Sequence, residues 1–220
     1  MPDSLKNKKV LQMGLGILGG GAATARFLVD QGATLTVTDM KTVDFLKPSL
    51  DKLADISDKI KFVLGEHREE DFLGNEIIVV NPDVPVDNNF VRLAKEKGKQ
   101  IENELSLFYK FCKSPNIIGV TGTRGKTTTT NWVAHLLQAS IVGNSPDDPF
   151  LGSSLNIEGD LVVEEPSFQL ELLGKYVNPT DGLKLAPHVA LITNLYRDHI
   201  NRHKSMEEYA QAKANIFKYQ

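Results

Sequence analysis

The chain has 220 residues, of which 41% are hydrophobic and 24% charged, a balance typical of a globular protein with one large or two small cores. The net charge of −3 argues against a nucleic-acid-binding protein that depends on a broad basic surface. A single cysteine excludes an internal disulfide framework, and no apolar run approaches the roughly 20 residues of a membrane span. We therefore expect a cytoplasmic protein with no nucleic-acid partner and no membrane insertion.

Short apolar runs alternate with helical patterns through the first half of the chain. The predicted strands are residues 8–14, 33–39, 61–66, 75–82 and 99–103, and the predicted helices are residues 19–32, 88–99 and 103–113. This alternation predicts a Rossmann-like domain, in which helices wrap a parallel sheet. The polar, proline-bearing segment 113–116 is the best linker, so we expect domains at residues 1–113 and 114–220.

The same alternation restarts after the linker. Residues 116–122, 160–165 and 188–194 are predicted to be buried strands, and residues 127–138 and 205–219 are predicted helices. Trp132 and Leu136 are expected on the apolar face of the first of these helices. Ligands of open parallel sheets gather at the carboxyl ends of strands, so the polar residues that follow these strands are where chemistry is expected.

The first glycine-rich loop follows the first predicted strand. Gly14, Gly16 and Gly19 fit the pattern G-x-G-x-x-G, and Asp39 ends the second strand, where a ribose-binding acid is expected. Backbone N–H groups of such a loop bind phosphates at the start of the following helix. A tight turn that needs small residues is the alternative. The loop favours nucleotide binding but does not distinguish NAD from another nucleotide.

A second glycine-rich loop lies in the stretch "GVTGTRGKTTTTNWVAHLL", residues 119–137. It departs from the common phosphate-loop pattern, because Val120 stands where the first glycine is expected. A strand precedes it, Lys126 can neutralise the outer phosphates and the Thr127 hydroxyl can bind Mg²⁺. A threonine-rich helix start is the alternative. The adjacent glycine, lysine and threonine favour a P-loop-type α/β ATP-binding domain.

Several segments resemble motifs of the Mur ligase family. "TGTRGKTTTT" resembles its ATP loop, which also lacks the first glycine, and "VVEEPSFQLE" resembles its E-L-S-S-F-Q-L-E strand end. "ITNLYRDHINRHKSMEEYAQAK" resembles its N-x-x-x-D-H-[LM]-D-R-[HY]…Y-x-x-A-K segment. "GLGILGGG…VTD" and "VVNPDVP" resemble the UDP-binding domain of the branch that adds D-glutamate. The resemblance spans nearly the whole chain.

The resemblance implies a ligase of peptidoglycan-precursor synthesis in a bacterial cytoplasm. ATP would phosphorylate the carboxylate of UDP-N-acetylmuramoyl-L-alanine, and the amine of D-glutamate would attack the acyl phosphate. Phosphoryl transfer depends mostly on positioning and charge neutralisation, so it calls for a cationic cradle and metal ions. ATP and Mg²⁺ are the expected cofactors.

The resemblance also assigns the ATP and metal residues. Thr127 and Glu164 would share one Mg²⁺ through oxygen ligands. His199 matches a second metal ligand, and Lys213 matches a lysine that the family carbamylates with CO₂. Without the motif, His199 would be a helix-start histidine and Lys213 a solvated helix residue. The expected catalytic residues are Lys126, Glu164, His199 and Lys213, and the expected ATP-binding residues are Gly122, Thr123, Arg124, Gly125, Lys126, Thr127 and Thr128.

Substrate residues follow from the same motifs, with three departures. Pro166 replaces the first of two paired serines and lacks its hydroxyl, Arg124 stands where Asn, His or Lys is usual, and Asp83 adds a negative charge near the expected diphosphate. The roles of these three residues are not predicted. The expected substrate-binding residues are Gly14, Leu15, Gly16, Ile17, Leu18, Asp39, Asn81, Asn144, Ser167 and Gln169.

Length is the largest departure from the family. Its members carry the rest of the ATP domain and a third domain that binds the incoming amino acid, so we expect a fragment with little or no turnover alone. A non-catalytic module that binds UDP precursors and ATP is one alternative, which Pro166 slightly favours. An NAD-dependent oxidoreductase is the other, and the second phosphate loop argues against it. Binding assays with a UDP-sugar, ATP and NAD separate the three.

Overall fold

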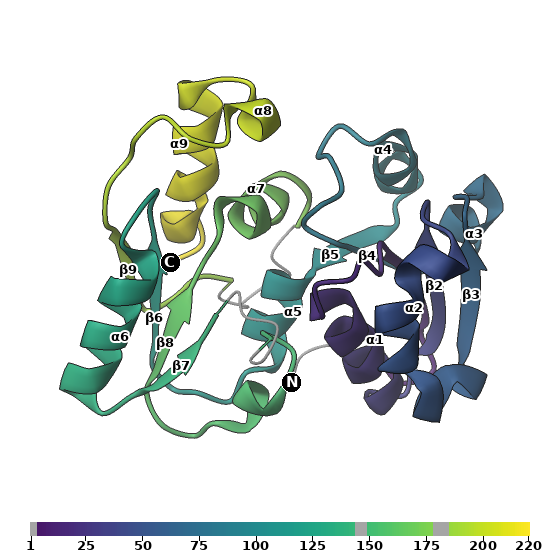
Figure 1. Ribbon diagram of the computed structural model, residues 1–220, viewed down its shortest axis with the longest axis horizontal. Coiled ribbons are helices and arrows are strands. Elements are labelled where there is room, and N and C mark those ends of the chain that lie inside the picture. The colour runs from purple at the N-terminus through teal and green to yellow at the C-terminus, as the bar shows by residue number, and fades with distance from the viewer. Residues whose placement is uncertain (1–3, 144–148, 178–184) are drawn as a thin grey trace. The chain divides into compact units, whose positions relative to one another are not determined.

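A computed structural model describes residues 4–143, 149–177 and 185–220 of the protein; the predicted substrate residue Asn144 lies outside them. The chain divides into two compact units, Met1–Glu104 and Leu105–Gln220 (Figure 1). The predicted boundary follows residue 113, so the two divisions differ in residues 105–113, which include helix α5 (Glu104–Phe111) except its first residue. Within the described ranges, no helix is both long and apolar enough to cross a membrane.

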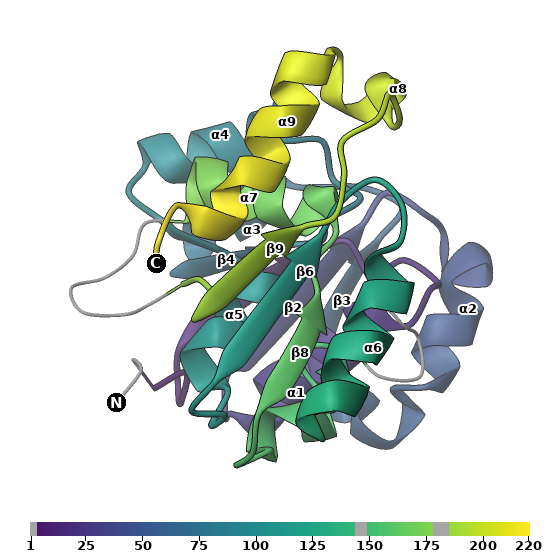
Figure 2. The ribbon, with the colours of Figure 1, turned by 90° about the vertical axis from the view of Figure 1, so that its left-hand side faces the viewer.

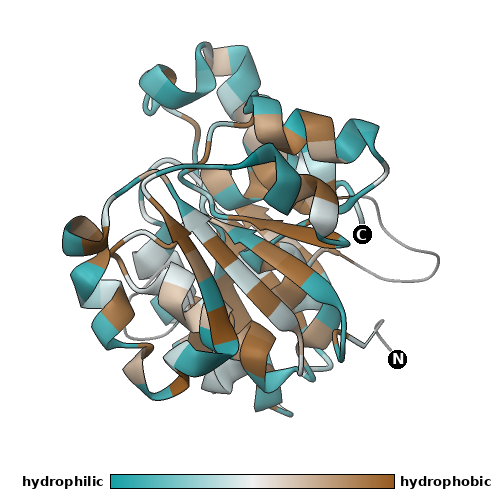
Figure 3. Cartoon of the chain, turned by 90° about the vertical axis from the view of Figure 1, so that its right-hand side faces the viewer, coloured by the Kyte–Doolittle hydropathy of each residue, from teal (hydrophilic) through white to brown (hydrophobic). Residues whose placement is uncertain are grey.

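The first unit is built on a five-stranded parallel sheet with the strand order β3-β2-β1-β4-β5. The predicted strand–helix alternation is confirmed, and the strands are rich in hydrophobic residues (Figure 3). The strands are β1 (Lys9–Met13), β2 (Thr34–Asp39), β3 (Ile60–Leu64), β4 (Ile77–Val80) and β5 (Gln100–Asn103), and the α-helices are α1 (Gly20–Asp30), α2 (Val43–Asp51), α3 (Glu69–Gly74) and α4 (Asn89–Glu96), with a 3₁₀ helix at Ala54–Lys59.

Two helices of this unit were not predicted. Helix α2 contains Pro48, whose missing N–H argues against a helix from sequence, yet the helix forms and buries Leu46 and Ser49. Helix α3 spans six residues, too few for a clear helical period. Tertiary packing, and not local preference, decides both elements.

The strand order of the first unit contains a reversal point. β1 pairs with β2 on one side and with β4 on the other, so the chain leaves the sheet in opposite directions after β1 and β4. In open parallel sheets this reversal point is where ligands bind. The glycine-rich loop follows β1, and Asn81 follows β4, so both predicted sequence features lie at this point.

The second unit contains a four-stranded parallel sheet with the order β7-β8-β6-β9, of which Figure 2 labels β8, β6 and β9. Helix α6 follows β6 and packs against β6, β7 and β8, while α7 packs against α9. The strands are β6 (Ile117–Thr121), β7 (Ser140–Val142), β8 (Leu161–Glu164) and β9 (Val189–Ile192), and the helices besides α5 are α6 (Lys126–Leu137), α7 (Ser167–Tyr176), α8 (Ile200–His203) and α9 (Met206–Ala214), with 3₁₀ helices at Ser153–Asn156 and Asn215–Phe217.

Two expectations about burial in this unit were wrong. Trp132 and Leu136 are 70% and 79% exposed, and α6 instead buries Thr130 and Ala134 against the sheet. The large apolar residues suggested one face, but the smaller residues allow the helix to approach the strands closely. Strand β9 is not buried either: Val189 is 56% exposed, because among the described residues β9 pairs with β6 alone at the edge of the sheet.

Candidate nucleotide and metal sites

The glycine-rich loop of the first unit depends on glycine at its first position. Gly14 has a φ of +93°, a conformation that residues with a side chain rarely adopt. A Cβ at this position would lie 2.8 Å from Cβ of Asn81, so the loop after β1 and the loop after β4 meet only without it. Leu15 is buried beneath the loop, whereas Ile17 and Leu18 are 42% and 71% exposed. The two exposed side chains are therefore open to apolar contact with a ligand.

Asp39 braces this loop from the end of β2. Its Oδ2 atom accepts hydrogen bonds from the N–H groups of Leu15 (2.8 Å) and Gly16 (3.1 Å), and Oδ1 accepts one from the N–H of Lys41 (2.9 Å). Two of the loop N–H groups expected to meet phosphate are thus bound to a carboxylate. The predicted ribose-binding role of Asp39 stays a prediction; the geometry adds a structural role.

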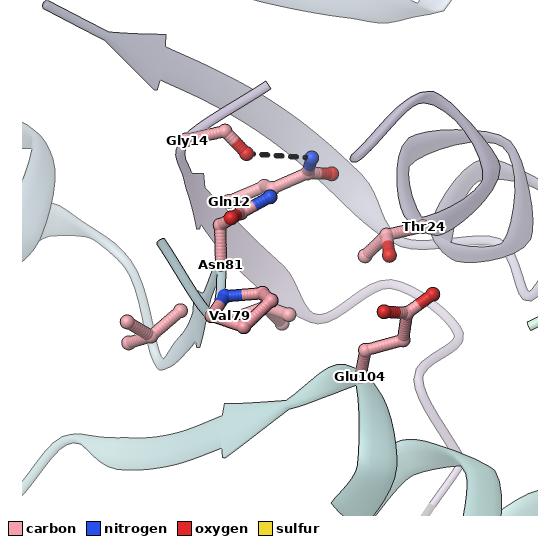
Figure 4. A pocket seen from close by; sticks show the side chains of 8 residues that line it. Gln12, Gly14, Thr24, Val79, Asn81 and Glu104 are labelled. Atoms are coloured by element: carbon pink, nitrogen blue, oxygen red, sulfur yellow. Dashed lines mark hydrogen bonds between the residues drawn. The ribbon is translucent and has the colours of Figure 1, made fainter. Parts of the chain in front are cut away.

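A small pocket lies beside the same loop (Figure 4). Gln12, on β1, donates from Nε2 to the carbonyl oxygens of Gly14 (3.2 Å) and Gly21 (2.8 Å), which joins strand, loop and helix α1. Thr24, Asn81 and Glu104 also line the pocket. Its volume of about 10 Å³ is that of a single water molecule, so the pocket is part of the packing beneath the loop and is too small for a nucleotide.

The second glycine-rich loop connects β6 to α6. Gly122 and Gly125 have φ values of +148° and +78°, and a Cβ on Gly122 would overlap the hydroxyl of Thr193. The first turn of a helix leaves its N–H groups without intrahelical partners, and among the described residues no side chain caps this one. Lys126 folds over the loop, with Nζ 3.4 Å from the Thr123 carbonyl oxygen. A positive side chain and free N–H groups together make an anion cradle.

Thr127 and Glu164, the predicted Mg²⁺ ligands, lie in direct contact. The Thr127 hydroxyl donates a hydrogen bond of 2.7 Å to Oε2 of Glu164. The two residues are far apart in sequence, and they meet because the parallel strands β6 and β8 are neighbours and end on the same side of the sheet.

Lys213 reaches the same loop from helix α9. It is 2% exposed, and its Nζ donates to the carbonyl oxygen of Gly122 (2.8 Å) and lies 4.6 Å from the ring centre of Tyr209. Burial, and then the positive charge of Lys126, lower the pKa of Lys213 to about 8. The simple expectation of a solvated helix lysine is therefore wrong. Because its pKa is lowered, Lys213 loses its proton and becomes a neutral amine at a lower pH than a lysine in water does.

His199 lies at the edge of this cluster. Its backbone is left-handed, with φ of +50°, and its side chain is 46% exposed. Its ring packs edge-on against Phe168 (5.0 Å between centres) and lies 6.2 Å from the ring of Tyr209. Tyr209 in turn donates a hydrogen bond from its hydroxyl to Oγ1 of Thr123 (3.2 Å). Tyr209 thus links His199, Lys213 and the phosphate loop.

Ser167 and Gln169, predicted substrate residues, are buried in helix α7, at 4% and 1% exposure. The hydroxyl of Ser167 is 3.1 Å from Nε2 of the fully buried His203. On the other side of that ring, Nδ1 lies 3.4 Å from Oε1 of Glu171, too long for a good hydrogen bond. Burial acts to raise the pKa of Glu171, but His203 and Arg202 together hold it below its usual value.

Glu165 is a second acid beside Glu164, but it points into the core. It is fully buried; Oε1 accepts a 2.7 Å hydrogen bond from the Tyr109 hydroxyl, while Oε2 has no partner within the described residues. Burial raises the pKa of Glu165 to about 8, despite the opposing effect of the Tyr109 hydrogen bond. Gly119 makes room for this side chain, because a Cβ there would overlap Oε1.

The residues present fit Mg²⁺ bound together with a nucleotide. The described ranges contain no group of three or more His, Cys, Asp or Glu side chains that could hold a metal by themselves. Mg²⁺ usually takes one or two protein oxygens and completes its shell with phosphates and water. The hydroxyl of Thr127 beside the carboxylate of Glu164 matches that donor set.

Sequence reasoning missed the contributions of Tyr209, His203 and Asn194. All three lie inside the segment "ITNLYRDHINRHKSMEEYAQAK", so a signal was present in the quoted motif. Their contacts are made with residues some 36 to 86 positions away, which no local pattern specifies.

Comparison with known families identifies both halves of the chain. The model of the Mur ligase middle domain matches residues 120–220, and the model of the MurD-like N-terminal domain of Mur ligases matches residues 8–103. The two matches cover the phosphate loop and the glycine-rich loop described above.

Curated relatives are similar along nearly the whole chain. A UDP-N-acetylmuramoylalanine--D-glutamate ligase from Roseiflexus sp. (strain RS-1) is 42% identical over 226 residues, covering 98% of this chain and 46% of the relative. The ligase of the same name from Clostridioides difficile (strain 630) is 40% identical over 220 residues, covering 97% and 46%. The chain thus spans about 46% of the length of these relatives.

Solved structures show the same fold. A UDP-N-acetylmuramate:L-alanyl-gamma-D-glutamyl-meso-diaminopimelate ligase from Neisseria meningitides has a TM-score of 0.57 at 16% identity, with 97% of this chain and 68% of that chain covered. A UDP-N-acetylmuramate-alanine ligase from Thermotoga maritima has a TM-score of 0.54 at 24% identity, with 97% and 47% covered. The predicted arrangement of a Rossmann-like sheet followed by a second parallel-sheet unit is confirmed.

Proposed function

Since this chain belongs to the Mur ligase family, we propose that it is the UDP-substrate-binding domain (residues 1–113) and the first part of the ATP-binding domain (residues 114–220) of a ligase that adds D-glutamate to UDP-N-acetylmuramoyl-L-alanine. The reaction would pass through an acyl phosphate and take place in a bacterial cytoplasm. The amine of D-glutamate would attack that acyl phosphate. The contact between Thr127 and Glu164 carries the proposal, because it joins the two sequence motifs into one metal-binding pair.

The second unit would bind ATP through its phosphate loop. The first-turn N–H groups of α6 and the ammonium of Lys126 would meet the phosphates, and Thr127 with Glu164 would hold Mg²⁺. Bound Mg²⁺ would neutralise charge on the phosphates during transfer to the substrate carboxylate. Charge neutralisation and positioning are what such a transfer requires.

Lys213 would serve as a metal ligand after carbamylation. Carbamylation joins the amine nitrogen to CO₂, releases a proton and turns a cation into an anion. The reaction requires a neutral amine, which the lowered pKa of Lys213 supports. His199 would bind a second metal ion near the same place, next to Tyr209, which also contacts Lys213.

The first unit would bind the UDP part of the substrate. The loop around Gly14, the exposed Ile17 and Leu18 and the carboxylate of Asp39 lie at the reversal point of the sheet, together with Asn81. An NAD-dependent oxidoreductase and a non-catalytic module are not favoured. The curated relatives are ligases, and Thr127 and Glu164, the residues proposed to hold Mg²⁺, lie in contact.

Calorimetric titration of the chain tests the proposal. We expect binding of Mg·ATP and of UDP-N-acetylmuramoyl-L-alanine, and no binding of NAD at the same concentrations. Glu164→Gln should weaken Mg·ATP binding by about tenfold or more, since a neutral amide oxygen is a weaker Mg²⁺ ligand than a carboxylate, and should leave UDP-substrate binding unchanged. Glu158→Gln, which changes an exposed glutamate of the same unit, is the matched control. Preferential NAD binding, or no effect of Glu164→Gln on Mg·ATP, would overturn the proposal.

A further inference from the structure

The backbone of Arg124, in the middle of the phosphate loop, is bound on both sides by the segment that follows β9. Its N–H donates to Oδ1 of Asn194 (3.0 Å), and its carbonyl oxygen accepts from Nδ2 of the same side chain (3.0 Å). The hydroxyl of Thr193 donates a further hydrogen bond of 2.7 Å to that carbonyl oxygen. One asparagine amide thus pairs with both polar groups of one loop residue.

This two-point contact requires asparagine or its longer homologue glutamine. A planar side-chain amide has one acceptor and two donors on adjacent atoms, whereas a carboxylate has acceptors alone and an aliphatic side chain has neither. The main chain of Asn194 also takes part, because its carbonyl oxygen accepts a 3.1 Å hydrogen bond from the N–H of Thr123. The residue therefore holds two consecutive positions of the loop.

Neighbouring contacts extend the same connection. The N–H of Tyr196 donates to Oγ1 of Thr123 (3.0 Å), and the N–H of Thr193 donates to the carbonyl oxygen of Thr121 (2.9 Å). The loop from Thr121 to Arg124 is thus fixed along its length by residues 193–196. His199 follows in the same segment, so the phosphate loop and the proposed second metal ligand share one support.

The arrangement also determines which N–H groups remain for phosphate. The N–H of Arg124 is directed at Asn194, whereas the first turn of α6 leaves the N–H groups of Lys126, Thr127 and Thr128 without intrahelical partners. The Arg124 side chain itself is exposed. Arg124 therefore contributes to the loop through its backbone, which explains how arginine can stand at a position where the family usually has other polar residues.

We propose that Asn194 is a positioning residue for phosphate binding: it holds the Arg124 peptide so that the loop is in its binding shape before the nucleotide arrives. This inference rests on the proposed function of the loop. Fixing the backbone of a flexible residue costs free energy, and a loop that is already ordered avoids that cost at the moment of binding. Without the hydrogen bonds from Asn194, the exposed loop would have to become ordered each time it bound phosphate, at a cost in binding free energy.

Two substitutions at Asn194 separate its two hydrogen bonds. Asn194→Leu keeps a side chain of similar size but removes both hydrogen bonds. Asn194→Asp keeps the acceptor for the N–H of Arg124, but it replaces the donor to the Arg124 carbonyl oxygen with a second oxygen, which that carbonyl oxygen repels. Asn116→Leu is the matched control, because it removes an exposed asparagine contact of 2.8 Å, to Asp160, in the same unit. Each variant is tested as the full 220-residue chain.

The first measurement is the affinity for Mg·tripolyphosphate, with UDP as an internal probe of the other unit. Asn194→Leu should weaken tripolyphosphate binding by about tenfold, as expected for the loss of two hydrogen bonds, and leave UDP binding unchanged. Asn116→Leu should change neither affinity by more than about twofold. Equal tripolyphosphate affinity in Asn194→Leu and the unchanged chain would overturn the proposal.

Hydrogen exchange of the Arg124 amide, followed by NMR, is the second measurement and needs no ligand. The amide should be protected in the unchanged chain and in Asn194→Asp, and should exchange about tenfold faster or more in Asn194→Leu, while amides in the middle of α6 stay unchanged. Unchanged exchange in Asn194→Leu would refute the positioning role. If the unchanged chain bound no tripolyphosphate, the proposed function would fail, and exchange at Arg124 would still decide the role of Asn194.

Discussion

The buried carboxyl of Glu165 makes the stability of the second unit depend on pH. In the unfolded chain a glutamate has a pKa near 4.5, whereas burial raises the pKa of Glu165 to about 8. Between these values the folded state keeps a proton that the unfolded state has released, so the free energy of unfolding falls as pH rises, by about 1.4 kcal/mol per pH unit. This contribution is fully present below pH 4.5 and is lost as pH rises to about 8.

Replacing the acid by its neutral isostere should remove this dependence. Glu165→Gln imitates the protonated acid, and its carbonyl oxygen can still accept the hydrogen bond from Tyr109. From pH 5.5 to pH 7.5, the unchanged chain should lose roughly 2–3 kcal/mol more of its unfolding free energy than Glu165→Gln. The exposed Glu158→Gln is the control and should follow the unchanged chain.

Urea unfolding at both pH values, followed by circular dichroism without nucleotide or Mg²⁺, measures the difference. Parallel pH dependence of Glu165→Gln and the unchanged chain would refute the reasoning, because it would mean that Glu165 is already ionised in the folded state.

Three further changes have expected outcomes. Thr127→Val removes the hydroxyl that contacts Glu164 and should weaken Mg·ATP binding about tenfold, with little effect on ATP measured without Mg²⁺; an equal loss in both titrations would contradict a metal role. His203→Ala leaves a cavity beside Glu171 and should lower the free energy of unfolding by roughly 2–4 kcal/mol, measured by urea; a change below about 0.5 kcal/mol would contradict it. Asp39→Ala releases the first glycine-rich loop and should weaken UDP binding in calorimetry while Mg·ATP binding stays unchanged; a loss confined to Mg·ATP would show that the two sites were assigned to the wrong units.

Much of the architecture followed from local sequence. Short apolar runs with glycine-rich turns predicted every strand described here except the three-residue β7, because parallel strands buried on both faces are recognisable as continuous apolar segments. The sequence did not predict which strand lies at the edge of a sheet, nor did it predict the short helices α2 and α3. β9 has the composition of a buried strand but lies at an edge, and α2 contains a proline that argues against a helix.

The candidate site divides in the same way. The motifs named Lys126, Thr127, Glu164 and Lys213 by their spacing and by their resemblance to a family, and Thr127 does meet Glu164. The sequence did not reveal that Lys213 is buried, because its helix pattern alone suits a solvated lysine. Its burial arises from contacts with Gly122 and Tyr209 that form only when α9 packs at the end of the sheet.

Sequence by itself determined the two parallel-sheet units, the two glycine-rich loops and the family, since each depends on residue types at short, fixed spacings. Only the tertiary structure decided what surrounds the phosphate loop. Three residues from much later in the sequence contact this loop: Asn194, Tyr209 and Lys213. They lie close to it because segments that follow different parallel strands meet at the same edge of a sheet. Arg124, unexplained from the sequence, is accounted for there by its backbone and not by its charge.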